Sequence, residues 1–178
     1  MKNLIKEFKN YKIQNPLEKE IVEKFINFLE KYWEKGFFRE NLKWHFTASI
    51  VVFNKDISKT LLMHHIKLDK WLNFWWHADW DVNVRNVAIR ELEEEAWISI
   101  KEEDLLDNFM DLDLQIIPER KKEPEHYHYD IRFVVTVDNN IDFQKQETEV
   151  NDIKWFDIEE LRSKKISDWV LKIVDKII

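Results

Sequence analysis

Apolar residues recur at two different spacings along this chain of 178 residues. After Pro16 they recur at helical spacing through 17–33, which predicts an amphipathic helix. Residues 45–53 and 60–65 are rich in β-forming side chains on either side of a turn-like Asn-Lys-Asp, which predicts a hairpin. Further strands are expected at 113–117, 127–137 and 153–156, helices at 83–96, 158–161 and 167–178, and a helical or irregular segment at 104–113.

Strands interleaved with two or three helices predict a mixed β-sheet that is covered on both faces, which is an α/β/α sandwich. The length fits a single domain. Within it, we expect residues 1–40 to form a helical extension packed on a domain of residues 41–178. The polar loop at 118–125 is bounded by prolines, and no segment is long enough to act as a linker between domains.

Composition and charge restrict the class of protein. A hydrophobic content of 44% beside a charged content of 35% is typical of a folded chain rather than a disordered one. A net charge of −7 disfavours direct nucleic-acid binding, which needs a basic surface. The absence of cysteine excludes disulfides, thiolate catalysis and cysteine-based zinc sites, and fits a cytoplasmic protein. No apolar run approaches the length of a membrane span, so we expect no membrane association.

The helix expected at 83–96 carries a dense group of carboxylates. Glu91, Glu94 and Glu95 stand at relative positions i, i+3 and i+4, which share one face of an α-helix. Such a face needs a counter-charge, and a hard divalent cation such as Mg²⁺ takes oxygen ligands of this kind. The alternative is a solvated acidic helix surface, which the charge spacing alone favours.

The residues around these glutamates resemble the Nudix hydrolase signature. Its Arg-Glu-aliphatic-x-Glu-Glu core and its last aliphatic position fall in register on Arg90, Glu91, Leu92, Glu94, Glu95 and Ile98. Upstream, residues 71–81 resemble a Nudix form that reads Trp-Leu-x-Pro-Gly-Gly-His-x-x-Gly-Asp. The signature's two glycines fall on Trp76 and Trp97, and its early glutamate falls on Val82. The resemblance covers about residues 45–161 and implies the same α/β/α sandwich.

The resemblance also implies a reaction. Nudix hydrolases use water and divalent cations to cleave a pyrophosphate linkage in a nucleoside diphosphate derivative, so a small-molecule nucleotide is the expected substrate. Glu91, Glu94 and Glu95 are then the ligands of Mg²⁺ (or Mn²⁺), and one of them, or Glu149, is the general base. Arg90 would form an ion pair that orients a glutamate. Two alternatives stay open: a catalytically inactive Nudix-fold module that binds a nucleotide or a protein, and a structural protein that binds a partner through an aromatic patch.

Two further segments are expected to contact the substrate. Trp75, Trp76 and His77 fall on the loop that handles phosphate in the family. The family's His-x-His-x-Asp-x-Arg strand is matched by His126, His128, Asp130 and Arg132. Because alternate residues of a strand share a face, the histidines and Asp130 project together, while Tyr127, Tyr129 and Ile131 point into packing on the other face. Two histidines and one aspartate on one strand rarely close a tetrahedral zinc site, so substrate contact or a buried polar network is favoured there.

Tryptophan stands where glycine is expected. At an average usage of about 7%, a chain of this length carries roughly a dozen glycines, whereas this one has one glycine and nine tryptophans. Our hypothesis is that UGA codons read as glycine in the living cell have been translated as tryptophan, as happens when the genes of some bacterial lineages are read with another code. The candidates are Trp44, Trp75, Trp76, Trp80 and Trp97; Trp71 and Trp155 fit the family as tryptophan, and Trp33 and Trp169 are unassigned. The alternative is a tryptophan-rich protein that has lost the signature's glycines.

Overall fold

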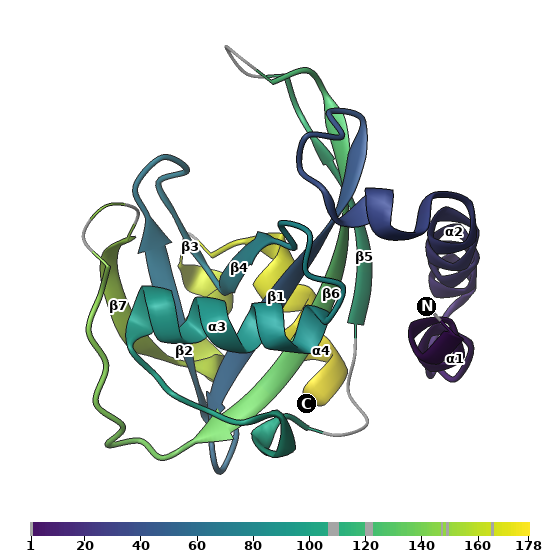
Figure 1. Ribbon diagram of the computed structural model, residues 1–178. Coiled ribbons are helices and arrows are strands. Elements are labelled where there is room, and N and C mark those ends of the chain that lie inside the picture. The colour runs from purple at the N-terminus through teal and green to yellow at the C-terminus, as the bar shows by residue number, and fades with distance from the viewer. Residues whose placement is uncertain (1, 107–110, 120–122, 147, 149, 165) are drawn as a thin grey trace. The chain divides into compact units, whose positions relative to one another are not determined.

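The computed structural model describes residues 2–106, 111–119, 123–146, 148, 150–164 and 166–178 (Figure 1). A seven-stranded sheet has the strand order β3-β2-β1-β6-β5, with β4 paired to β1 and β7 paired to β2. The chain divides into two compact units. The first holds the described residues of 1–48, 77–84 and 110–132, the second holds those of 49–76, 85–109 and 133–178, and β1 and β6 contribute to both.

The first unit begins with the helices α1 (Lys2–Lys9) and α2 (Pro16–Tyr32). The Asn15 side chain caps α2 by accepting a hydrogen bond from the backbone N–H of Glu18, and Pro16 occupies the first helical turn, where its missing N–H costs nothing. The apolar stripe of α2 is buried, as the spacing of residues 17–33 predicted. A short 3₁₀ helix, η1 (Trp33–Phe37), follows.

An aromatic core holds these helices to the strands of the first unit. Phe28 of α2 stacks on Tyr129 with ring centroids 4.1 Å apart, and Phe25 meets the ring of Phe8 edge-on at 5.6 Å. Pairs of this geometry add to the stabilisation that burial of their apolar area gives. Gly36 is placed where a Cβ would lie 2.9 Å from Phe28 Cε1, so the chain's one glycine lets the backbone approach this core.

The strands of the first unit are the start of β1 (Trp44–Asn54), β5 (Asp111–Ile117) and the first part of β6 (His126–Val137). β5 and β6 pair antiparallel, with Asp113 opposite Asp130. One expectation for β6 is wrong: Tyr127 does not point into packing but is 39% exposed. The opposite, polar face is the more buried one, because His126, His128 and Asp130 are at most 5% exposed.

The second unit contains β2 (Lys59–His65), β3 (Lys70–Leu72), most of β4 (Phe74–His77), and β7 (Val150–Asp157). β2 returns antiparallel from β1, so the predicted hairpin is confirmed. Figure 1 shows α3 (Val84–Ala96) in front of the sheet and α4 (Asp168–Ile177) behind it. α4 buries Val170, Ile173 and Val174 against the strands. The predicted mixed sheet with helices on its faces is therefore confirmed.

Several elements differ from the sequence prediction. α1, β3 and β4 were not predicted. β3 and β4 are too short for a period to be visible, whereas α1 is amphipathic, with Leu4 and Phe8 buried one turn apart, and was overlooked. The segment at 158–161 is a 3₁₀ helix, η3 (Ile158–Ser163), and the segment at 104–113 holds the end of η2 (Glu102–Asp104) and the start of β5. Residues 107–110 of that segment lie outside the described residues. Among the helices that the structure describes, none has the length and apolar character that crossing a membrane requires.

Three tryptophans have a positive φ, a backbone conformation that side chains other than glycine rarely adopt. Trp33, Trp80 and Trp97 have φ angles of 39°, 71° and 58°, and they make up half of the six non-glycine residues with positive φ among those described. Trp97 follows the last residue of α3 and donates its backbone N–H to the carbonyl of Glu93 at 2.9 Å. A bulky side chain is an outlier in this conformation, whereas glycine adopts it freely. These angles support the hypothesis of glycine at positions 80 and 97 and add position 33.

Candidate functional site

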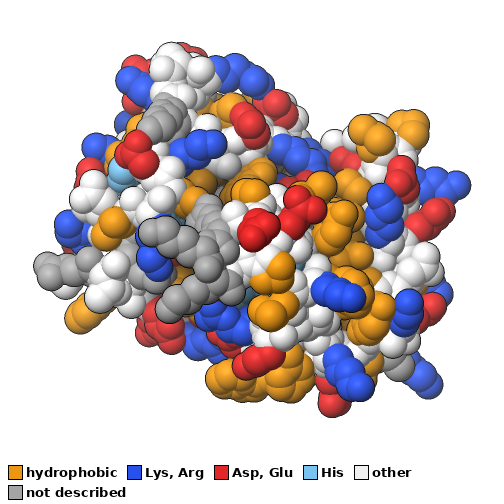
Figure 2. Space-filling view, turned by 90° about the horizontal axis from the view of Figure 1, so that it is seen from above, with side chains coloured by type: hydrophobic (Ala, Val, Ile, Leu, Met, Phe, Trp, Pro, Cys, Tyr) orange, Lys and Arg blue, Asp and Glu red, His pale blue; other side chains and the backbone are white. Residues whose placement is uncertain are grey.

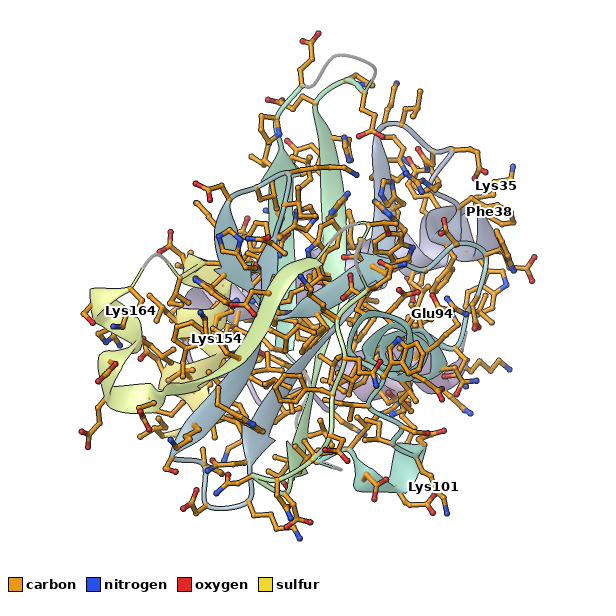
Figure 3. The ribbon with its side chains drawn as sticks, turned by 90° about the vertical axis from the view of Figure 1, so that its left-hand side faces the viewer. Lys35, Phe38, Glu94, Lys101, Lys154 and Lys164 are labelled. Carbon is orange, nitrogen blue, oxygen red and sulfur yellow. The ribbon has the colours of Figure 1, made fainter. Side chains whose placement is uncertain are left out.

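Helix α3 arranges the predicted glutamates as its periodicity requires. Ala88 and Leu92 are fully buried, so they lie on the inward face of the helix. Glu91 and Glu95, one turn apart, are only 4% and 3% exposed, which is rare for carboxylates. Glu94 is much more open, with 58% of its side chain exposed, and Figure 3 shows it projecting from the helix. The helix thus offers two buried carboxylates and one at the surface.

Arg90 lies beside this group. Its Nη2 is 3.4 Å from Glu91 Oε1, and its Nε is 3.9 Å from Glu94 Oε1. The guanidinium thus bridges a buried carboxylate and an exposed one, which is the intrahelical ion pairing expected of it. The group offers carboxylate oxygens from three glutamates on one helix, and such oxygens are the ligands that suit Mg²⁺. The residues present therefore fit this cation.

The loop before β7 approaches the end of α3. The backbone N–H of Gln144 donates to the carbonyl of Ala96 at 3.0 Å, and that of Gln146 donates to the carbonyl of Glu95 at 3.1 Å. These bonds fix the segment that leads to Glu149, although Glu149 itself lies outside the described residues. Its expected role as a general base stays a prediction.

Trp75 and Trp76 lie in β4, not in an irregular loop. Both side chains are half-buried. Trp44, at the start of β1, packs against the ring of Tyr32 at 5.0 Å and that of Phe28 at 6.4 Å. None of these three has a positive φ. At these positions, the backbone angle does not distinguish tryptophan from glycine.

Arg132 is the most enclosed of the predicted substrate contacts. It is 1% exposed, and its nitrogens reach three carboxylates: Asp130 at 2.8 Å, Asp111 at 3.2 Å and Asp113 at 2.5 Å. These neighbouring carboxylates raise the pKa of Arg132, although burial opposes them. The aspartates also accept hydrogen bonds from Tyr11, Thr47 and Gln115. This geometry is that of a buried structural network.

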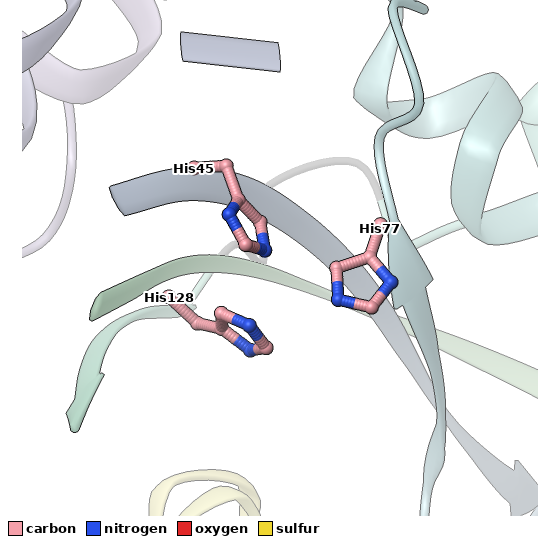
Figure 4. Close-up of side chains that lie close together, drawn as sticks. All are labelled: His45, His77 and His128. Carbon is pink, nitrogen blue, oxygen red and sulfur yellow. The ribbon is translucent and has the colours of Figure 1, made fainter. Parts of the chain in front are cut away.

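Three histidines from different strands converge in the first unit. His45 of β1, His77 at the end of β4 and His128 of β6 each offer one ligand nitrogen, and these nitrogens all lie within 4.8 Å of one another (Figure 4). Across the described part of the chain, no other group of three histidine or acidic residues meets that criterion, so the glutamates of α3 do not. Mg²⁺ keeps several waters and needs no closed protein cage, so this difference does not count against the glutamates.

Burial keeps these imidazoles uncharged at neutral pH. Loss of solvent, reinforced by neighbouring imidazoles and Arg39, lowers the pKa of His77 to about 3 and that of His128 to about 2. Burial likewise lowers the pKa of His45 to about 4. Sequence reasoning missed His45, because it lies 32 positions from His77 and no spacing links the two. It also missed Asp111 and Asp113, which resemble ordinary strand residues.

A large hollow of the second unit is acidic. It has a volume of about 740 Å³, lies between the β1–β2 turn and the end of α4, and is lined by four acidic side chains: Asp56, Asp157, Glu159 and Glu160. Four carboxylates would repel a phosphate group, so this hollow is not a phosphate site.

The face drawn in Figure 2 carries acidic and basic side chains interspersed, with hydrophobic patches between them. Among the described residues of that face, the basic side chains do not gather into one field.

Comparison with known proteins gives a consistent result. A family model described as "NUDIX domain" matches residues 43–177. A Caenorhabditis elegans Ap4A hydrolase, solved as a binary complex, is similar in fold, with a TM-score of 0.60 at 19% identity over 74% of this chain and 93% of that one. A MutT NUDIX hydrolase from Burkholderia pseudomallei gives a TM-score of 0.60 at 13% identity over 75% and 97%. The NUDIX domain of Shewanella oneidensis NrtR, complexed with ADP ribose, gives 0.52 at 16% identity over 74% and 84%. No curated protein sequence matches the chain.

Proposed function

This chain belongs to the Nudix family, and on that premise we propose that it hydrolyses a pyrophosphate linkage in a nucleoside diphosphate derivative. The observation that carries the proposal is the pair of buried carboxylates, Glu91 and Glu95, one turn apart on α3. Buried acids are costly unless a positive charge compensates them, and Arg90 lies 3.4 Å from one of the two, Glu91. In this proposal, a divalent cation held by Glu91, Glu94 and Glu95 adds further positive charge.

The residues of α3 have distinct roles in this proposal. Mg²⁺ or Mn²⁺, when bound, would neutralise charge on the phosphate oxygens and make the phosphorus atom more electrophilic towards water. Glu91 and Glu95 bind from fixed, buried positions, while the exposed Glu94 can adjust to the substrate. Arg90 holds Glu91 and Glu94 in place. One glutamate, with Glu149 as a candidate, accepts the proton of the attacking water, and the bond from phosphorus to the leaving oxygen breaks.

We place the phosphates of a small-molecule nucleotide at Trp75, Trp76 and His77. Glycine at 75 and 76 would leave space beside the backbone for phosphate oxygens, whereas two indoles fill that space. His126, His128 and Arg132 are proposed as support for this region and not as direct contacts, because each is at most 5% exposed.

A second candidate is a Nudix-fold module that binds a nucleotide without hydrolysing it. The half-buried indoles of Trp75 and Trp76 favour this function if the tryptophans are native. The Shewanella oneidensis NUDIX domain complexed with ADP ribose provides a precedent for a nucleotide bound in this fold. This candidate predicts nucleotide binding with no phosphate release.

The test compares two synthetic genes, one with tryptophan and one with glycine at positions 44, 75, 76, 80 and 97. Each protein is incubated with nucleotide sugars, dinucleotides and nucleoside triphosphates, with Mg²⁺, with Mn²⁺ and with chelator. We expect metal-dependent hydrolysis by the glycine form, and Glu95→Gln should lower its turnover at least a hundredfold with an unchanged circular dichroism spectrum. Exposed Glu93→Gln on the same helix is the control and should retain activity. Undiminished turnover in Glu95→Gln, or full activity in excess chelator, would remove Glu95 from the mechanism.

A further inference from the structure

The rings of His45, His77 and His128 face one another across a small space in the first unit. Their centroids are 4.6 Å apart between His45 and His128, 5.0 Å between His45 and His77, and 5.2 Å between His77 and His128 (Figure 4). His45 is 3% exposed and His128 is 2% exposed. Buried imidazoles can serve as hydrogen-bond donors, as acceptors or as metal ligands, and the positions of their protons decide which.

Hydrogen bonds to the outer nitrogens fix two of these proton positions. His45 Nδ1 lies 3.2 Å from the carbonyl oxygen of Asn41, so Nδ1 carries the proton and Nε2 carries the lone pair. The neighbouring His126 donates from Nδ1 to the carbonyl of Pro124 at 2.8 Å, which leaves its Nε2 as an acceptor. That acceptor lies 3.0 Å from His128 Nε2, so His128 donates from Nε2 and its lone pair is on Nδ1.

The lone pairs lie on buried atoms. His45 Nε2 is buried and has no hydrogen-bond partner among the described residues, and His128 Nδ1 is buried as well. The ring of His77, whose tautomer is not fixed in this way, lies beside both. Lone pairs gathered in one place repel one another and attract a positive charge. An anion such as phosphate would need donors at these positions, so the fixed tautomers of His45 and His128 disfavour it.

The surroundings fit a single bound ion. A cavity of about 20 Å³ is lined by two of the three histidines, His45 and His77, and also by Arg39, Leu42, Glu123 and His126; His128 lies next to it but does not line it. A volume of this size holds roughly one water-sized particle. The carboxylate of Glu123 can act as a fourth ligand or offset the charge of the cation. The outer N–H groups of His45 and His126 donate to backbone carbonyls, and such bonds orient imidazoles in metal sites.

We propose that His45, His77 and His128 form a second metal site, separate from the glutamates of α3, which binds Zn²⁺ or another borderline divalent cation through imidazole nitrogens. Imidazole suits Zn²⁺, whereas Mg²⁺ prefers oxygen. Tetrahedral ligands at Zn–N distances of about 2.0–2.1 Å stand about 3.3 Å apart. From nitrogens that lie within 4.8 Å, the rings have to close by at most about 1.5 Å. Because the ligands come from β1, β4 and β6, the cation would join three strands.

The test uses the full-length protein after dialysis against chelator. Co²⁺ is the probe, because three nitrogen ligands in a tetrahedral site give strong visible absorption and octahedral oxygen sites give weak absorption. We expect saturable tetrahedral bands at one Co²⁺ per chain, which Zn²⁺ displaces. We also expect saturating Zn²⁺ at about a hundred times its dissociation constant to raise the melting temperature by about 5–10 °C.

Variants assign the bands to the cluster. His45→Gln and His128→Gln should each weaken Co²⁺ binding at least a hundredfold, while His64→Gln, at a histidine outside the cluster, and Glu95→Gln should leave it unchanged. If a glutamine variant fails to fold, His45→Cys keeps a ligand and should retain binding with a new sulfur-to-cobalt charge-transfer band. Absence of saturable tetrahedral bands in the parent, or equal binding in His45→Gln, would overturn the proposal. Loss of hydrolysis in Glu95→Gln with these bands intact separates this site from the proposed catalytic one.

Discussion

Removing the charge of Arg132 should strongly destabilise the protein. Arg132→Met keeps most of the volume of the side chain but leaves Asp111, Asp113 and Asp130 without their shared cation. Asp111 and Asp130 are 0% and 4% exposed, so water cannot replace the guanidinium without opening the structure. The cost therefore comes from uncompensated buried charge, not from lost packing.

The magnitude follows from the contacts. Breaking a buried ion pair by removing one partner costs about 3–5 kcal/mol. For a chain of this size, each kcal/mol lowers the melting temperature by roughly 2–4 °C, so Arg132→Met should melt about 6–20 °C below the parent. Arg132→Lys keeps the charge but cannot reach three carboxylates from one planar group, and we expect an intermediate loss of about 1.5–3 kcal/mol.

The assay is thermal and urea unfolding followed by circular dichroism, with Arg162→Met as the matched control. Arg162 also pairs with an aspartate, Asp175, but its side chain is 68% exposed. Exposed pairs contribute little, so this control should melt within about 2 °C of the parent. A double-mutant cycle with Asp113→Asn should recover part of the loss, because it removes one of the unbalanced charges. If Arg132→Met and Arg162→Met melt at the same temperature, the network is not a buried charge cluster.

Three further outcomes are expected. Trp97→Gly should raise the melting temperature by about 2–8 °C, because it relieves a left-handed φ at a side chain that is 64% exposed, while Trp155→Gly, in strand β7, should lower it; equal shifts would refute the backbone argument. Gly36→Ala should lower it, because the added Cβ would meet Phe28 Cε1 at 2.9 Å, and Phe28→Leu should recover part of that loss. Glu95→Gln should melt no lower than its parent in chelator, since it removes one of two neighbouring buried carboxylates; a large loss would make Glu95 a structural residue.

Local pattern was enough to predict much of the fold. Helical periodicity and a proline start located α2, and the carboxylate spacing located α3 to within a residue. The hairpin of β1 and β2 followed from β-forming runs on either side of a turn. In contrast, β3 and β4 span three and four residues, which is too short for a period to be visible. Their pairing depends on tertiary context, to which a single sequence gives no access.

The candidate sites likewise differ in how far they could be predicted from local sequence. The glutamates of α3 are close in sequence, so helical spacing alone placed them together. The histidine cluster is assembled from β1, β4 and β6, and only the strand pairing brings His45 and His77 near His128. The strand face that carries His126 and Asp130 was predicted correctly, and its burial agrees with the buried polar network that was one of the two expectations for it. A buried polar face needs hydrogen-bond partners from other strands, and the sequence alone does not show which residues those are.

Several tryptophans stand at positions whose backbone conformation favours glycine. Left-handed φ is uncommon for any side chain, and a protein has no reason to select tryptophan for it. Yet Trp33, Trp80 and Trp97 supply three of the six positive φ values at described non-glycine residues. Trp80 and Trp97 are also 71% and 64% exposed, so their indoles gain little from burial to offset the strain. The Nudix signature indicates glycine at position 97, and the Nudix form that residues 71–81 resemble indicates it at position 80, both independently of these angles. Glycine there explains the signature, the angles and the exposure together, whereas native tryptophan requires a separate reason for each.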